Sequence, residues 1–154
     1  MVIDHYQIFD LLDTVFFVLR KKSRQITTLH VLHHSHMPIL TWLAIKFFPH
    51  PPPALTLLLN STVHIVMYIY YYMAADPRYK QNLWWKKYIT VLQLVQFLIL
   101  LTQVLVLYEL PCIQSPVHRF FLHVAIVQDL YFIYAFSKFY IDTYITTDKK
   151  IKTT

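Results

Sequence analysis

Five apolar stretches, separated by short basic or proline-containing connections, take up most of this 154-residue chain. They cover residues 6–19 (A), 26–48 (B), 53–75 (C), 88–107 (D) and 117–140 (E). Segments B to E are long enough to cross a bilayer, because about 20 helical residues span the hydrocarbon core. The runs are continuous rather than alternating, which favours helices over a membrane β-barrel. We therefore predict one domain, 1–154, that forms an all-α polytopic membrane helical bundle with about four full spans and one partial N-terminal span.

Composition excludes several classes of site. Only 14% of the residues are charged, against about 25% in a typical soluble domain. Glycine is absent, which rules out the glycine-dependent dinucleotide, phosphate-loop and nucleophile-elbow motifs. The one cysteine, Cys112, allows neither an internal disulfide nor a cysteine-based zinc site. Nothing resembles a nucleic-acid-binding module.

Every second connection between the apolar segments is rich in basic residues. They lie between A and B (Arg20, Lys21, Lys22, Arg24), between C and D (Arg78, Lys80, Lys86, Lys87) and after E (Lys149, Lys150, Lys152). The positive-inside rule therefore predicts that these connections and the tail, 141–154, are cytosolic. Lys150 and Lys152 also resemble a dilysine retrieval signal, so we expect a multi-pass protein of the endoplasmic reticulum membrane with a cytosolic C-terminus.

Three histidines mark segment B. His30, His33 and His34 are spaced i, i+3 and i+4, which places them on one helical face. Ionisable side chains in a membrane span are costly and indicate a functional site by default. His36 lies off that face, and we assign it a structural role.

The cluster has three interpretations. The imidazoles could hydrogen-bond across a bundle, as structural histidines do. They could bind a metal, since HxxHH is also a ligand box of membrane di-iron desaturases and hydroxylases, although the other histidines form no further boxes. They could act as nucleophile and acid–base groups, because imidazole works near neutral pH and burial keeps it neutral. We favour the third, since a water-poor site would protect a labile acyl-imidazole.

Further polar residues follow helical spacing in the next segments. Asn60 and His64 are i and i+4 in segment C, where the amide could fix the imidazole tautomer. Gln93 and Gln96 are i and i+3 in segment D. In segment A, Asp10 and Asp13 also share a face, and Lys87 or the histidines are candidate partners for these carboxylates. The tyrosines around Tyr68 and the pair Trp84–Trp85 predict an interfacial aromatic belt.

Five blocks in order resemble the fatty-acid elongase family, the membrane 3-ketoacyl-CoA synthases. They are LLDTVFFVLRKK (11–22), HVLHH (30–34), NSTVHIVMY (60–68), WWKKYIT (84–90) and QLVQF (93–97). The resemblance implies a seven-span fold, of which this chain would be an N-terminally truncated member starting within the third span. Two positions depart from the family pattern: Tyr72 stands where glycine is usual, and Asp10 where glutamate is common.

The resemblance also implies an activity. Family members condense a long-chain acyl-CoA with malonyl-CoA to 3-ketoacyl-CoA, releasing CO2 and CoA, and need no metal or redox cofactor. His33 would accept the acyl group, His30 and His34 would orient it and exchange protons, and His64 would lie beside the thioester. The candidate substrate-binding residues are Asn60, Gln93, Gln96, Lys87, Tyr68 and Asp13.

Partners and rival functions follow from the same residues. We expect contact with acyl-CoA, malonyl-CoA and membrane lipid, and association with a second copy or with other elongation enzymes. The alternatives are a membrane di-iron lipid desaturase or hydroxylase, and a catalytically inactive elongase-like protein that binds lipid.

The predicted topology can be tested with glycosylation tags. A tag between segments B and C should be modified in the lumen, whereas a tag between C and D should stay unmodified, because basic connections are retained in the cytosol. Gel mobility before and after deglycosylation measures both. The reverse pattern would invert the orientation.

Overall fold

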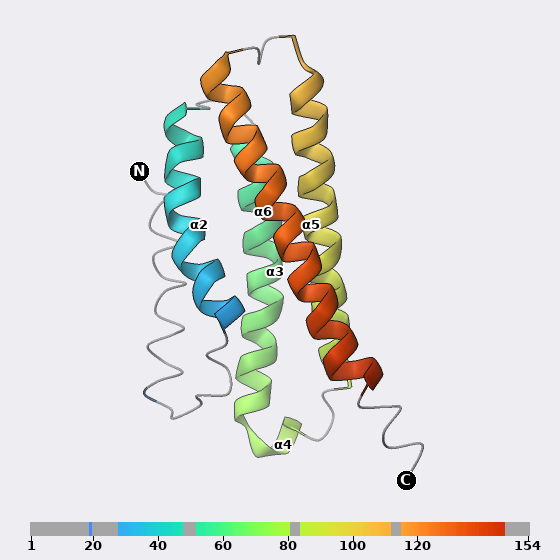
Figure 1. The fold of residues 1–154 in the computed structure, drawn as a ribbon. Helices are drawn as coiled ribbons and strands as arrows, with labels where there is room; N and C mark the ends of the chain where they lie inside the picture. Colours follow the sequence, from blue (N-terminus) through green and yellow to red (C-terminus); the bar gives the residue numbers. More distant parts are fainter. Residues whose placement is uncertain (1–18, 20–27, 48–51, 81–83, 112–114, 147–154) are drawn as a thin grey trace. The chain divides into compact units, whose positions relative to one another are not determined.

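The computed structural model describes residues 19, 28–47, 52–80, 84–111 and 115–146, and every regular element in them is helical (Figure 1). In chain order the elements are α2 (Thr28–Phe47), α3 (Pro52–Ala75), α4 (Pro77–Lys80), α5 (Lys86–Glu109), α6 (Pro116–Tyr140) and η2 (Ile141–Ile145). The chain divides into two compact units, Met1–Pro53 and Ala54–Thr154. The first contains α2, and the second contains the remaining helices and nearly all of α3. The all-α prediction is confirmed for the described residues.

Three of the described helices are long and apolar enough to cross a membrane: Ala54–Ala75, Lys86–Glu109 and Pro116–Ile145. They correspond to segments C, D and E, so the chain is a multi-pass membrane protein. Segment B also folds into a 20-residue helix, α2. It is not among the three, because four of its residues are histidines, which lower its hydropathy. Apart from Leu19, segment A lies outside the described residues, as does the tail after Thr146; the predicted domain boundaries stay predictions.

Proline and polar residues set the helix ends. α3 begins at Pro52 and ends at Ala75, immediately before Asp76 and Pro77. α6 begins at Pro116, whose fixed φ suits the first helical turn and whose missing N–H is not needed there. At the other end of α6, η2 continues the helix as one wider turn through Ile145. The predicted bounds of segments B to E agree with α2, α3, α5 and α6 to within two residues.

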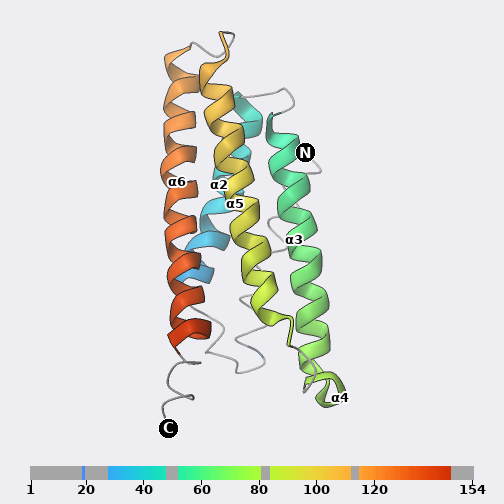
Figure 2. The same cartoon turned by 90° about the vertical axis from the view of Figure 1, so that its right-hand side faces the viewer.

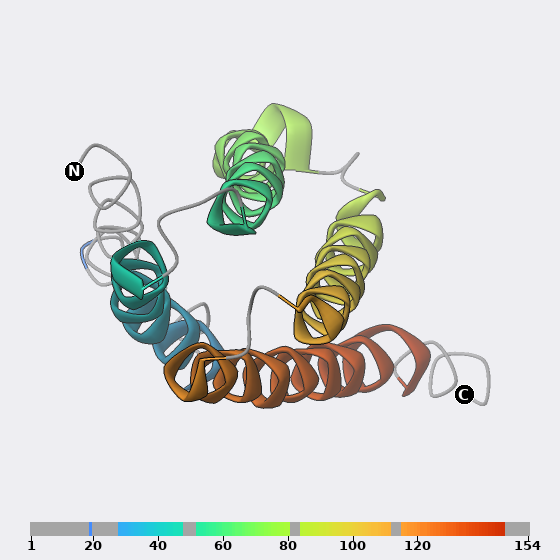
Figure 3. The ribbon, with the colours of Figure 1, turned by 90° about the horizontal axis from the view of Figure 1, so that it is seen from above.

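An aromatic stack joins α5 and α6, which lie side by side (Figures 2 and 3). The ring of Phe97 stacks on Phe132 with centroids 5.3 Å apart and contacts Phe136 at 5.4 Å. Phe97 and Phe132 are both buried. Toward the other end of the pair, Tyr108 of α5 meets the ring of His123 edge-on at 5.4 Å. Because lipid tails are as apolar as these side chains, the contact is stabilised by packing rather than by exclusion of water.

α3 meets α5 close to α4. The Gln93 amide nitrogen donates a hydrogen bond to the Met67 sulfur at 3.2 Å, and the Tyr70 and Trp85 rings meet edge-on at 5.4 Å. In the turn between them, Asp76 accepts hydrogen bonds from the backbone N–H of Arg78 at 2.9 Å and from its guanidinium at 2.7 Å. These bonds favour the carboxylate and lower the pKa of Asp76. The Asp76–Arg78 bonds thus stabilise the turn between the end of α3 and the start of α4.

The Phe97 stack should contribute measurably to stability. Phe97→Ala removes a buried ring that touches two others, so we expect a loss of about 3 kcal/mol in the free energy of unfolding, the lower end of the range for Phe→Ala. Denaturation of the purified protein by a strong detergent, followed by circular dichroism, measures the loss. Leu130→Ala, at a 51% exposed position of α6, is the control. Equal losses in the two variants would contradict the role given to the stack.

Candidate functional site

Two histidines lie close together on α2. The His33 and His34 rings meet edge-on, with centroids 5.4 Å apart and planes at 79°. Both side chains are buried, at 8% and 4% exposure, whereas His36 is exposed, consistent with its position off their face. His30 lies in the first turn of the same helix, but its side chain is outside the described part of the structure. The helix therefore presents a pair of imidazoles in a segment that is otherwise largely apolar.

A proline follows this pair within the helix. Pro38 lies inside α2, four residues after His34. A proline has no N–H to donate to the carbonyl four residues earlier, and its ring opposes a straight helix at that point. Pro38 therefore interrupts the backbone hydrogen bonds of α2 in the turn that carries the imidazoles.

A second polar face belongs to α3. Asn60 and His64, one turn apart, are both buried. The His64 ring meets the ring of Tyr68, a further turn along, edge-on at 5.9 Å. The three predicted residues of this helix therefore share one face, with the two rings in direct contact.

α5 contributes two amides to the same unit. Gln96 is buried, and Gln93 bonds the sulfur of Met67, which lies three residues after His64 on α3. Gln93 is therefore held against α3 about one turn from His64. Lys87 lies in the first turn of α5 with its side chain exposed and its ammonium 5.2 Å from the Tyr88 ring centroid.

The structure brings together part of the predicted site. Within Ala54–Thr154, His64 and Tyr68 touch, and Gln93 contacts the helix that carries them. His33 and His34 belong to the other unit, so a joint site with His64 stays a prediction. Asp10 and Asp13 lie outside the described residues. In the part of the chain that the structure describes, no group of three or more His, Cys, Asp or Glu side chains is placed to hold a metal ion.

One buried carboxyl was missed by sequence reasoning. Asp129 lies near the middle of the α6 span and is only 6% exposed. It shares a helical face with Phe132 and Phe136, which pack on Phe97 of α5. The rule that singled out the histidines, an ionisable residue inside an apolar span, would also have found it.

The position of Asp129 predicts the cost of inserting α6. Asp129→Leu should make the free energy of membrane insertion of this segment about 3 kcal/mol more favourable. An aspartate at a helix centre costs about 2.5–3.5 kcal/mol, whereas a leucine there favours insertion by about 0.3–0.6 kcal/mol. Two glycosylation acceptor sites flanking residues 116–145 report the inserted fraction in microsomes. Asp142→Leu, near the helix end, is the matched control and should gain far less. Equal gains at the two positions would show that Asp129 is not central in the span.

Known proteins place this chain in a family. Residues 5–152 match the family described as ELO: GNS1/SUR4 family. A very long chain fatty acid elongase of Aedes aegypti is 40% identical over 139 residues, covering 90% of this chain and 38% of that protein. Very long chain fatty acid elongase 7 of Drosophila melanogaster is 39% identical, covering 91% and 42%, and elongase 1 of Mus musculus is 38% identical, covering 90% and 50%.

The matched region is a larger share of this chain than of its relatives. The matches take in about nine-tenths of this chain but half or less of each relative. The family match itself takes in nearly every residue of the chain. On this evidence, the chain belongs to the ELO: GNS1/SUR4 family.

Proposed function

We propose that this chain carries the condensing chemistry of fatty-acid elongation, joining a long-chain acyl-CoA and malonyl-CoA to give 3-ketoacyl-CoA, CO2 and CoA. The observation that carries the proposal is the buried, edge-on pair His33–His34 on α2, in a chain whose relatives are named very long chain fatty acid elongases. Imidazole can act as a nucleophile near neutral pH, and a site poor in water protects an acyl-imidazole from hydrolysis.

The first half-reaction transfers the acyl group to the protein. An imidazole nitrogen of His33 attacks the thioester carbonyl carbon, a C–N bond forms, and the C–S bond breaks. The departing CoA thiolate takes up a proton, for which His34 and His30 are the nearest carriers in sequence. The imidazole is regenerated in the second half, so it is a true catalyst.

In the second half-reaction, the decarboxylation of malonyl-CoA generates the carbon nucleophile. Malonyl-CoA loses CO2, and the electron pair of the broken C–C bond becomes the enolate that attacks the acyl-imidazole carbonyl. A new C–C bond forms, the C–N bond breaks, and the departing His33 nitrogen takes up a proton, which regenerates the neutral imidazole. This route needs no strong base and no metal or redox cofactor, which suits a site of imidazoles and amides.

The polar residues of α3 and α5 position the substrates. Asn60 holds the His64 tautomer, and His64 and Tyr68 lie beside the reacting thioester. Gln93 and Gln96 donate to its oxygen from α5. Lys87, exposed at the start of α5, attracts the phosphates of CoA, and Asp13 partners a cation of the site.

The location of the chain is part of the same proposal. The basic connections and the Lys150–Lys152 pattern support an endoplasmic reticulum membrane protein with a cytosolic C-terminus. That orientation gives the water-soluble CoA moieties access from the cytosol, while the acyl chain stays among the helices. Association with a second copy or with other elongation enzymes would pass the product on.

Substitution of the nucleophile tests the proposal. His33→Ala should lower malonyl-CoA incorporation into acyl chains on the order of 10²-fold or more, because no other group replaces the covalent step. His36→Ala, at an exposed position of the same helix, is the control. Both are assayed in elongase-deficient membranes, in this chain and in a chimaera that adds the N-terminal part of the Drosophila melanogaster relative.

A second readout isolates the acyl transfer. Incubation with acyl-CoA alone should release one equivalent of CoA and leave an adduct on the peptide containing His33, detected by mass spectrometry. Retained incorporation in His33→Ala, or an adduct on another residue, would remove His33 as nucleophile. Stoichiometric iron in the purified active protein would support the di-iron alternative instead.

A further inference from the structure

The Gln93 amide of α5 meets α3 on the helical face that carries the buried polar residues. Asn60, His64 and Met67 are spaced i, i+4 and i+7, so their side chains project from one face of α3. Asn60 and His64 are buried. The Nε2 atom of Gln93 lies 3.2 Å from the Met67 sulfur. The contact from α5 therefore lies about one helical turn from the His64 position.

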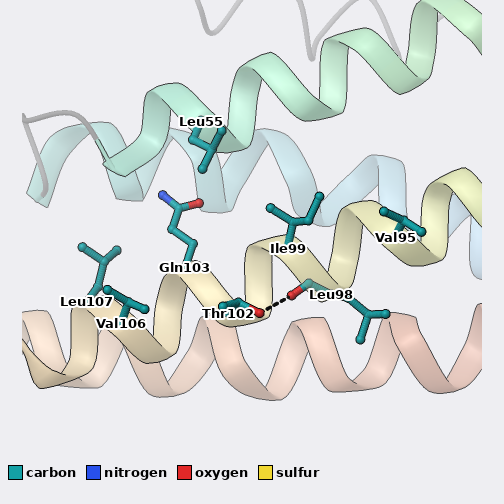
Figure 4. A pocket seen from close by; sticks show the side chains of 8 residues that line it. All are labelled: Leu55, Val95, Leu98, Ile99, Thr102, Gln103, Val106 and Leu107. Carbon is teal, nitrogen blue, oxygen red and sulfur yellow. Dashed lines mark hydrogen bonds between the residues drawn. The ribbon is translucent and has the colours of Figure 1, made fainter.

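Farther along α5, the surface toward Leu55 of α3 is mainly aliphatic (Figure 4). The hydroxyl of Thr102 donates to the carbonyl four residues earlier at 2.8 Å, so its polarity is used within the helix. Gln103 follows Gln93 by ten residues, which is about 15 Å along a helix that rises 1.5 Å per residue. An amide at Gln103 is therefore too distant to replace Gln93 beside His64.

The thioether of Met67 determines which end of the Gln93 amide faces α3. A methionine sulfur accepts hydrogen bonds and has no hydrogen to donate. It therefore favours the NH2 group of Gln93 on the α3 side, as observed, and turns the amide oxygen away. A hydrogen-bond donor at position 67 would instead attract the amide oxygen and reverse the amide.

The bonded nitrogen of Gln93 carries a second hydrogen. An amide NH2 group has two N–H donors, and the Met67 sulfur accepts one of them. Among the residues that the structure describes, the Gln93 side chain forms no other hydrogen bond. The second N–H starts from the same nitrogen atom, so it also lies at the contact of α3 with α5 and is available to a bound substrate.

We propose that Met67 is a positioning residue, which holds the Gln93 amide so that its second N–H donates to the carbonyl oxygen of the thioester beside His64. The proposal rests on the condensing function proposed above and adds to it the means by which the donor is oriented. Negative charge develops on the thioester oxygen during the reaction, and an oriented donor stabilises that charge. Because sulfur is a weak acceptor, it orients the amide without competing strongly with an oxyanion.

The methyl resonance of Met67 tests the contact and the donor without requiring turnover. The full chain is labelled with 13C-methyl methionine in detergent, and resonances are assigned by replacing each methionine with leucine. The probes are two unreactive analogues of a long-chain acyl-CoA. One is a ketone with a methylene between the carbonyl and the sulfur, and the other is a thioether that lacks the carbonyl. The ketone should shift the Met67 resonance and the thioether should not, because the ketone alone offers an oxygen to Gln93.

Substitution of the amide completes the spectroscopic test. Gln93→Leu should shift the Met67 methyl resonance in the unliganded protein and abolish its response to the ketone, since the N–H donors are gone. Met73 lies on the same helix, six residues after Met67. Its methyl resonance is the internal reference and should stay unchanged in Gln93→Leu.

A double-mutant cycle separates positioning from packing. In the chimaera with the N-terminal part of the Drosophila melanogaster relative, Met67→Leu conserves volume and should lower kcat for malonyl-CoA incorporation about fivefold, the factor of one ordinary hydrogen bond. KM should change little. In a Gln93→Leu background the same substitution should have no further effect, because Met67 acts through the amide. Met67→Gln restores an acceptor and should recover much of the activity, and Met73→Leu is the control.

Each contrary result has a defined meaning. A Met67 resonance that does not respond to Gln93→Leu, or that responds equally to the two analogues, would overturn the proposal. Equal losses from Met67→Leu in both backgrounds would reduce Met67 to a packing residue and overturn it as well. A carbonyl-dependent shift with unchanged incorporation in His33→Ala would keep the positioning role and reject the nucleophile. Loss of incorporation in His33→Ala without that shift would do the reverse.

Discussion

In hydrocarbon, every backbone N–H and C=O must find its partner within the protein, and this requirement governs the structure of the chain. Helices meet it within a single segment, so the apolar stretches fold as α3, α5 and α6. The polar chemistry is then confined to side chains at helical spacing. The sets His30–His33–His34, Asn60–His64–Tyr68 and Gln93–Gln96 all follow that rule, because loops cannot supply such groups at membrane depth.

The helices could be predicted closely because their ends are chemically marked. Prolines begin α3 and α6, Asp76 and Pro77 follow α3, and lysines begin α5, so the expected bounds differ from the observed ones by at most two residues. The number of strongly apolar spans was harder to predict. Segment B has the length of a span, but its histidines, the residues that make it interesting, also reduce its hydropathy.

The candidate site was predictable where it depends on spacing within one helix. The contact of His64 with Tyr68 and the exposure of His36 both follow from a period of 3.6 residues. Contacts between helices were not predictable, because periodicity does not define which faces meet. The Gln93–Met67 hydrogen bond and the Phe97 stack depend on how α3, α5 and α6 pack. Asp129 was missed for a simpler reason: it stands alone, without a second polar residue at helical spacing to draw attention to it.

The histidines of α2 also affect the order in which the chain can enter a membrane. α3, α5 and α6 have enough hydropathy to partition into lipid as individual helices, whereas each imidazole of α2 opposes that transfer. α2 precedes all three in the chain, so during synthesis it leaves the ribosome before any of them. The helix that carries the histidine pair therefore has less drive to enter lipid by itself than α3, α5 or α6.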